Sequence, residues 1–458
     1  MNHELKRKLR ARKLDPAYIV CSVVNPSQEF SEDAIKRGVI APPVHRSFLW
    51  MLIGNGTFSL SQWARISVLA KLSSPGIVGE YCLALALVAP IFTFTNLQLS
   101  AVQATDARHR YRFCDFAGLR LLSSTLVLLA VGFLTVALHR RDPLAWILTL
   151  GLATDSLCEI FGGLQQKHER MDRLGMSLLL RGMLSILAFS AVFFQTRSLV
   201  WAAAALPAAS FLVLVTWDIP KGKSLLRGAP MLAWSLERLR GLALFALPLG
   251  INMLLISLNV NIPRYALAKY SGRSELGIFA SLSYVVMAVG LVVNGLGQSV
   301  SARLSRYYAE GMLLKFRSLI ARLCGAGTLL GLCCLAGAAL IGRPLLALLY
   351  RPEYAAHLNV FLVLAATSGV SAVASFLGYG ITAAHVFRRQ LWTMLAVVTT
   401  TSAGSLILVP RYHAMGAAFS LLLSALVGVC GAWLVLSCAL RAYRTEHDAA
   451  HFRPASAR

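Results

Sequence analysis

The sequence predicts an all-α protein that is integral to a membrane. Of its 458 residues 57% are hydrophobic and only 14% are charged, and the mean hydropathy is +0.64. Apolar stretches of roughly 18–24 residues recur along the chain, and each is long enough to cross a bilayer as a helix. This composition excludes an ordinary soluble domain.

Twelve apolar stretches are predicted, and a polar linker divides them into two sets of six. They lie at 47–69, 78–99, 121–138, 144–165, 174–194, 199–217, 242–262, 276–298, 323–341, 358–380, 391–409 and 415–438. We therefore expect two six-helix lobes, 47–217 and 242–438, which a cytoplasmic linker at 218–241 joins. An N-terminal arm at 1–46 and a cytoplasmic tail at 439–458 complete the chain.

The arm 1–46 contains no apolar core followed by a cleavage site, so it does not have the pattern of a signal peptide. Its basic run ELKRKLRARK suits either contact with anionic lipid headgroups or a cytoplasmic partner, or a simple positive anchor. The nine cysteines fall mostly inside apolar stretches and show no metal-ligand spacing. We therefore expect neither a metal site nor a cofactor.

The positive charge predicts the orientation of the chain. Most of the 44 Lys and Arg residues fall in segments on the side of the N-terminus, when the twelve stretches are threaded alternately through a membrane. Short cytoplasmic loops carry such an excess, so both termini are predicted to be cytoplasmic. The same distribution explains most of the net charge of +24 without a nucleic-acid partner.

Two similar motifs indicate that the lobes are repeats. LAKLSSPGIVGEY at Leu69–Tyr81 aligns with LAKYSGRSELGIF at Leu267–Phe279, with Gly79 opposite Gly277. Because six is an even number, both lobes enter the membrane from the same side. They are therefore predicted to be parallel repeats about an axis along the membrane normal, with a site between them.

The first helix of the second lobe is unusually polar, because it carries Asn252, Asn259 and Asn261. Buried amides are costly unless they are partnered or wet, so this helix should line a protein interior or a water-filled cavity. The helical period puts Asn252 and Asn259 on one face, and Ser257, Asn261 and Arg264 on another. We expect this helix to form a wall of a transport path.

The first helix of the first lobe carries a similar polar stripe. Asn55, Gln62 and Arg65 lie on one face together with two serines, and Leu60 points elsewhere. Arg65 and Arg264 fall one position apart when the lobes are aligned. A guanidinium presents a planar fork of donors that suits a diphosphate. The alternative is that Arg65 extends to water at the end of its helix.

The fourth and fifth stretches contain three charged residues. The two stretches run in opposite directions on either side of a turn, so equal distances from the turn place Glu159 and Arg181 at the same depth. This predicts an ion pair between them that holds the first lobe together. Asp155 lies deeper, with no obvious partner. It is predicted to bind a coupling proton or sodium ion. The alternative is that a neighbouring amide or Arg65 satisfies it.

Four segments resemble a known family. They are ARISVLAKLSSPGIVGEYCLALALVAP at Ala64–Pro90, LQLSAVQATD at Leu97–Asp106, LPLGINMLLISLNVNIPRYALAKYSGRSELGIFA at Leu247–Ala280, and LLALLYRPEYAAH at Leu345–His357. With them the chain resembles, over roughly 47–438, the polysaccharide biosynthesis and export flippases. These are relatives of the MATE exporters within the multidrug/oligosaccharidyl-lipid/polysaccharide (MOP) superfamily.

The resemblance implies a MATE-like fold of two six-helix lobes and a function. The function is to flip an undecaprenyl-diphosphate-linked oligosaccharide of O-antigen, capsule or exopolysaccharide across the bacterial inner membrane by alternating access. It implies cationic residues in the central cavity, for which Arg65 and Arg264 are the candidates, and Ser100 stands where an arginine is expected. It also implies membrane lipids and polysaccharide polymerase or export proteins as partners.

Two other classes compete with this interpretation. A MATE-like drug or organic cation antiporter, driven by a proton or sodium gradient, would need acidic residues in its cavity, whereas here arginines outnumber buried acids toward the outer side. A membrane enzyme acting on lipid-linked glycans would need large periplasmic loops with catalytic residues, and the sequence has none. We therefore expect a transporter and not an enzyme.

Overall fold

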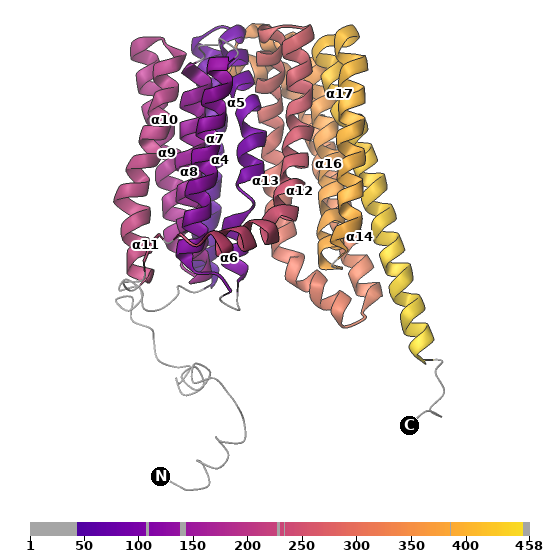
Figure 1. The fold of residues 1–458 in the computed structure, drawn as a ribbon. Coiled ribbons are helices and arrows are strands. Elements are labelled where there is room, and N and C mark those ends of the chain that lie inside the picture. The colour runs from indigo at the N-terminus through magenta and orange to yellow at the C-terminus, as the bar shows by residue number, and fades with distance from the viewer. Residues whose placement is uncertain are drawn as a thin grey trace.

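A computed structural model of the chain describes residues 44–106, 110–137, 143–226, 230–232, 234–384 and 386–451. Most of the predicted N-terminal arm and the last part of the predicted tail lie outside these ranges. Every regular element of the described residues is helical (Figure 1). This agrees with the all-α membrane fold that the composition predicts.

The helices carry the labels of Figure 1. They are α4 (Val44–Leu72), α5 (Pro75–Thr95), α6 (Leu99–Thr105), α7 (Phe113–Ala137), α8 (Pro143–Lys167), α9 (Met171–Thr196), α10 (Leu199–Val213), the π-helix η1 (Leu214–Asp218), α11 (Ile219–Leu226), α12 (Leu236–Tyr270), α13 (Arg273–Ala309), α14 (Leu313–Leu349), α15 (Pro352–Ala355), α16 (Leu358–Ala383) and α17 (Phe387–His451). The predicted linker 218–241 therefore contains α11 and the start of α12.

Ten helical segments in the described part of the chain are long and apolar enough to cross a membrane. The polar helix α4 contains the first predicted stretch but is not one of the ten. The last two predicted stretches both lie in α17, which bends back at His413, a residue with non-helical φ and ψ of 50° and −128°. The protein is therefore a multi-pass membrane protein, although these ten segments do not by themselves establish twelve spans.

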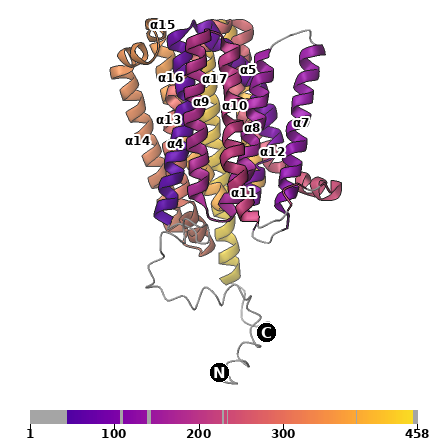
Figure 2. The ribbon, with the colours of Figure 1, turned by 90° about the vertical axis from the view of Figure 1, so that its left-hand side faces the viewer.

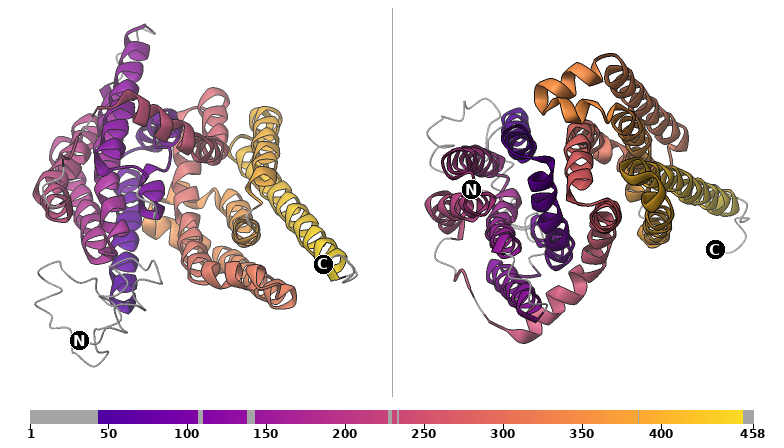
Figure 3. Two further views of the ribbon diagram at one scale, coloured as in Figure 1. Left: turned by 60° about the horizontal axis from the view of Figure 1, so that its bottom comes forward. Right: turned by 90° about the horizontal axis from the view of Figure 1, so that it is seen from above.

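The helices of the first half (α4–α11) pack mainly with one another, and so do those of the second half (α12–α17). In the first half α8 contacts α5, α7, α9 and α10, and in the second half α16 contacts α13, α14 and α17. Contact between the halves comes mainly from α5, which packs against α12 and α13. Figures 1 and 2 and the view from above in Figure 3 show these two groups of upright helices.

Helix α5 is shorter than the predicted stretch 78–99, because the chain breaks between α5 and α6. Leu97 and Gln98 both adopt left-handed backbone angles, with φ of 50° and 52°. Irregular backbone at membrane depth needs cover from protein or water. Leu97 is buried, and Gly250 of α12 lies so close that a Cβ there would fall 2.6 Å from its Cδ2. The second half therefore covers the break in the first.

Two glycines allow a close backbone contact between the halves. A Cβ on Gly79 would lie 1.8 Å from the carbonyl oxygen of Arg273, and one on Gly277 would lie 2.0 Å from that of Pro75. Gly79 and Gly277 are equivalent in the aligned motifs, and so are Pro75 and Arg273, the first residues of α5 and α13. The contact is therefore reciprocal, as a two-fold relation between parallel repeats requires. Small residues let the two backbones approach this closely.

The glycine contact lies at what we call the upper end, where the turns at 73–74 and 271–272 join the helices. Other interactions tie the two halves there. Lys71 donates from Nζ to the carbonyl oxygen of Leu348 at 3.0 Å, and Arg273 forms a surface ion pair with Glu80 at 3.5 Å. Exposed pairs contribute little to stability. The close backbone packing and the buried apolar residues of both halves around it therefore contribute more at this end.

Substitution of Gly277 by alanine should loosen the upper end. The added methyl group has no room, and overpacking of this kind typically costs about 1–3 kcal/mol of stability. We expect a lower melting temperature for Gly277→Ala in a fluorescence-based thermal unfolding assay in detergent. Gly290→Ala on the same helix is the control, since nothing lies within 4 Å of its Cβ position. Equal melting temperatures for the two variants would contradict the glycine contact.

His357 and Glu275 form a pH-dependent contact outside the apolar core. His357 Nε2 lies 3.7 Å from Glu275 Oε1, and this carboxylate raises the pKa of the histidine above its usual value. A raised pKa in the folded protein means that the contact stabilises the protein below the unfolded pKa of about 6.5 and is lost as the pH rises through the raised value.

Wild type should therefore melt at a higher temperature than His357→Gln at about pH 6, and the difference should fade in alkaline buffer. Melting curves at a series of pH values measure it. Glu275→Gln should show the same pattern, because it removes the other partner. A stability difference that is constant with pH would show that the contact is not ionic.

Candidate functional site

Arg264 is a buried cation near the C-terminal end of α12. It lies on α12 and is 7% exposed, and its Nη1 donates to Asn261 Oδ1 at 3.3 Å. Asn261 in turn donates from Nδ2 to the carbonyl oxygen of Ser257 at 2.8 Å. The guanidinium also lies over the ring of Tyr284 on α13, 5.8 Å from its centroid. The structure thus brings together Ser257, Asn261 and Arg264, as the helical period predicts.

Arg65 of α4 lies across from Arg264, in the first half of the protein. It is partly buried, and its Nε is inaccessible and has no hydrogen-bond partner among the described residues. Both arginines interact electrostatically with Tyr284, and Arg65 also interacts with Tyr81 of α5. We name Arg65, Arg264, Tyr81 and Tyr284 the arginine centre. It joins helices from both halves.

No carboxylate within the described ranges forms a salt bridge with either arginine of this centre. Removal of a guanidinium from water is costly unless a counter-charge or several hydrogen bonds replace the water. One amide oxygen and one aromatic face are modest compensation for Arg264. The positive charge of the centre is therefore not neutralised by a carboxylate of the described residues.

A groove of about 730 Å³ runs between α4 and α13. Gln62 and Trp63 of α4 line it, and so do Tyr284 and Leu291 of α13. Its lining is mostly apolar, and several of its leucines are about half exposed, including Leu60 at 59%. The groove therefore places an apolar surface directly beside Tyr284 of the arginine centre.

The polar stripe predicted on α4 is only partly in this groove. Gln62 lines it, whereas Asn55 is exposed elsewhere and donates to the carbonyl oxygen of Met51 in its own helix at 2.9 Å. Leu60, which the period assigned to another face, does line it, together with Ile53 and Trp63. The groove favours apolar side chains because it opens at the apolar surface of the protein.

The remaining asparagines of α12 have different surroundings. Asn259 accepts a hydrogen bond at Oδ1 from the hydroxyl of Thr401, and so ties α12 to α17 within the second half. Asn252 is partly buried and makes no side-chain hydrogen bond within the described ranges. Neither belongs to the arginine centre, so their assignment to substrate binding remains a prediction.

The predicted pair of Glu159 and Arg181 is wrong. Arg181 donates from Nη1 to Asp155 Oδ1 at 3.3 Å, and Ser210 donates to the same oxygen at 2.7 Å. Glu159 instead accepts from Asn96 Nδ2 at 2.8 Å. The turn between α8 and α9 lies between Lys167 and Met171 and is centred slightly earlier in the chain than the prediction assumed. The long side chain of Arg181 also reaches one helical turn further along α8, to Asp155. Asp155 is therefore not the unpaired carboxylate that the sequence suggested.

A second buried acid lies near this pair and was not predicted. Asp218 is fully buried at the end of the π-helix η1, and it accepts from Ser177 Oγ at 3.0 Å. Its Oδ1 and both amide atoms of Gln165 have no hydrogen-bond partner among the described residues. No sequence pattern pointed to Asp218 as a buried acid, because it stands where the polar linker was expected to begin.

Double-mutant cycles should identify the partner of Arg181. Removal of one partner of a buried ion pair typically costs about 3–5 kcal/mol, and contacting residues show non-additive effects. We expect Arg181→Met and Asp155→Asn to couple by more than about 1 kcal/mol in thermal unfolding. Arg181→Met and Glu159→Gln should be close to additive. A larger coupling for the second pair would restore the original assignment.

The fold is shared with solved membrane-transporter structures. No family model matches the sequence. A MATE multidrug transporter of the MOP superfamily, in an inward-facing conformation, aligns over 85% of this chain and 96% of its own with a TM-score of 0.68 and 13% identity. The outward-facing conformation of a MATE transporter aligns over 87% and 96%, with a TM-score of 0.56 and 15% identity. The chain therefore has the fold of the MOP-superfamily transporters.

One relative identified by its sequence has a more specific name than the structures that share the fold. The chain is 26% identical over 393 residues to the capsular polysaccharide biosynthesis protein CapF of Staphylococcus aureus. The alignment covers 84% of this chain and 97% of that protein. The chain thus shares its fold with MOP-superfamily transporters and is similar in sequence to a protein named for capsular polysaccharide biosynthesis.

Proposed function

We propose that the protein moves an undecaprenyl-diphosphate-linked oligosaccharide, a repeat unit of O-antigen, capsule or exopolysaccharide, from the cytoplasmic to the periplasmic leaflet. The observation that carries this proposal is the arginine centre, where Arg65 and Arg264 lack a carboxylate partner within the described ranges. A diphosphate is the anion that fits guanidinium groups best, because it accepts their parallel hydrogen bonds. The relative named for capsule biosynthesis supports a polysaccharide substrate.

The groove between α4 and α13 supports a substrate with a lipid tail. If the protein is open towards the bilayer, a polyprenyl chain can stay in the lipid while its diphosphate enters the protein. The chain then keeps its apolar surroundings. The apolar groove ends beside Tyr284, so a tail could leave through it while the diphosphate lies at the arginine centre. A soluble anion would not need this apolar exit.

Alternating access would use the two halves as lobes, 47–217 and 242–438. The tight contact of Gly79 and Gly277 at the upper end and the wide groove below it fit a conformation that is open on one side. The higher TM-score against the inward-facing transporter favours the cytoplasmic side as the open one. The distribution of basic residues favours cytoplasmic positions for both termini. The bacterial relative favours a bacterial cell membrane, the inner membrane where there are two.

Asp155 is the proposed coupling residue in the first half. Its carboxylate is 30% exposed although its partner Arg181 is 3% exposed, and Tyr81 of the arginine centre lies within its electrostatic range. A proton or sodium ion that competes with Arg181 for this carboxylate could couple an ion gradient to the centre. Polysaccharide polymerase or export proteins would receive the product outside.

A drug or organic cation antiporter with the same fold is the alternative. Cation recognition would need acidic side chains at the transport path. Among the described residues, the linings of the groove and of the cavity near Arg264 contain no aspartate or glutamate. The polarity of the site therefore favours an anionic substrate.

The test is complementation of a deletion strain by wild type, Arg264→Ala, Arg65→Ala and the control Arg322→Ala, which removes an exposed arginine of α14. Wild type and the control should restore glycan at the cell surface. Loss of either central arginine should reduce surface glycan about tenfold or more, because a charge-assisted contact contributes about 1.5–3 kcal/mol. Lipid-linked oligosaccharide should accumulate on the inner leaflet.

Arg264→Lys should restore only part of the activity, since an ammonium lacks the planar fork. Membrane levels of each variant are measured to exclude loss of the protein. If the deletion leaves surface glycan unchanged and instead raises sensitivity to organic cations, the flippase proposal is overturned.

A further inference from the structure

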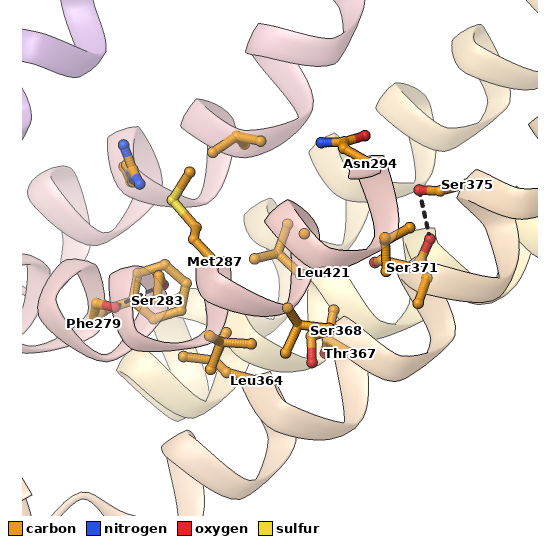
Figure 4. A pocket seen from close by; sticks show the side chains of 17 residues that line it. Phe279, Ser283, Met287, Asn294, Leu364, Thr367, Ser368, Ser371, Ser375 and Leu421 are labelled. Atoms are coloured by element: carbon orange, nitrogen blue, oxygen red, sulfur yellow. Dashed lines mark hydrogen bonds between the residues drawn. The ribbon is translucent and has the colours of Figure 1, made fainter. Parts of the chain in front are cut away.

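A second cavity lies inside the second half, between α13 and α16, and Arg264 contributes to its wall (Figure 4). Its volume is about 270 Å³, and all of its lining residues belong to the second half. It is therefore separate from the groove between α4 and α13, although Met287 of α13 borders both. The proposed exit of the lipid tail does not use this cavity.

Hydroxyl groups mark one side of the cavity. Thr367, Ser371 and Ser375 follow one another at intervals of four residues, so they lie on one face of α16, and Ser368 lies beside them. On the opposite wall α13 contributes Ser283 and the amide of Asn294. Figure 4 shows Ser371 and Ser375 next to each other, with Asn294 near them.

Most of these hydroxyl groups already donate a hydrogen bond within their own helix. Thr367, Ser368 and Ser375 donate to carbonyl oxygens of their own helix at 2.7, 2.7 and 2.9 Å. A serine hydroxyl has two further lone pairs that can accept a hydrogen bond. The cavity wall can therefore accept hydrogen bonds from a group that brings its own hydroxyl hydrogens.

The charge of the lining residues further limits which ligands can fit this cavity. Arg264 is the one ionisable side chain that lines this cavity, and the other lining residues are apolar or uncharged. A cation would meet Arg264 with no acid to balance it, and a second anion would find no second cation. The cavity suits an uncharged group that has both apolar and hydroxylated surfaces and is joined to an anion at Arg264.

From this geometry we infer that the cavity is a subsite for the sugar attached directly to the diphosphate. The inference rests on the proposed function, because it requires the diphosphate at Arg264. A monosaccharide ring presents apolar C–H faces and a rim of hydroxyl donors, which match the two kinds of lining. The volume corresponds to about nine waters at roughly 30 Å³ each, which is enough for about one monosaccharide.

The test compares two kinds of ligand on the full-length protein in nanodiscs. One is a short-chain polyprenyl diphosphate, and the other is the same lipid carrying a single sugar, drawn from glucose, galactose and their acetamido analogues. The variant Ser371→Leu/Ser375→Leu fills the cavity, and Ser299→Leu is the matched control on α13, exposed and outside both cavities. Binding isotherms give the dissociation constants.

Wild type should bind at least one glycosylated lipid about tenfold more tightly than the bare diphosphate, as one or two net hydrogen bonds would give. The double leucine variant should lose this preference and keep its affinity for the bare diphosphate within about twofold. Ser299→Leu should keep the preference. If the double variant does not fold, Ser371→Val alone should reduce the preference in the same direction.

The subsite is overturned if the double leucine variant keeps the preference, or if wild type binds every glycosylated lipid no better than the bare diphosphate. Tighter binding of the bare diphosphate by the leucine variant would instead indicate an isoprenoid group in the cavity, and would also overturn it. Binding of the bare diphosphate that Arg264→Ala abolishes supports the proposed function in each of these cases. If wild type binds neither lipid, the proposed function and the subsite both fail.

Discussion

The burial of two guanidinium groups without a carboxylate partner in the described chain is the constraint on which this structure depends. Arg264 is almost completely buried, and Arg65 has an inaccessible Nε without a hydrogen-bond partner there. A protein that only had to be stable would pair such groups or replace them with apolar ones. Their retention at the junction of the halves is explained if the missing counter-charge arrives with a substrate.

The rest of the architecture serves this centre. The glycine contact between α5 and α13 holds the halves together at the upper end, close to both arginines in sequence. Below it α4 and α13 bound an apolar groove, while α13 and α16 enclose a smaller cavity with hydroxyl groups. The apolar groove borders Tyr284 and the hydroxylated cavity borders Arg264. Together with the cationic arginine centre they form three chemically different surfaces. An amphiphile with an anionic joint between a lipid and a sugar has the same three parts.

The Asp155–Arg181 pair in the first half differs from the arginine centre in its balance of charge. There the arginine has a carboxylate partner, and a second acid, Asp218, is fully buried nearby. The centre between the halves has an excess of positive charge, whereas this cluster in the first half has an excess of acids. Substrate binding and ion coupling can therefore occupy different parts of one transporter.

The sequence predicted the local features better than the long-range ones. Apolar length predicted where most helices lie, and the helical period grouped Ser257, Asn261 and Arg264, because both depend on neighbours in the chain. The break at Leu97 and Gln98 was missed, since its cover comes from Gly250 of another helix.

The partner of Arg181 and the groove-facing side of α4 were missed for the same reason. Both depend on helix tilt and on the reach of long side chains, which periodicity does not encode. Tyr284 was missed because a tyrosine among apolar residues has the pattern of ordinary core packing.

The most direct test of the central claim is the sign of the charge that the arginine centre binds. Purified protein in nanodiscs is titrated with a short-chain polyprenyl diphosphate and, separately, with the lipophilic cation tetraphenylphosphonium. The account predicts that the diphosphate binds saturably, that Arg264→Ala weakens this binding about tenfold or more, and that the cation does not compete. Saturable binding of the cation together with no binding of the diphosphate would contradict it.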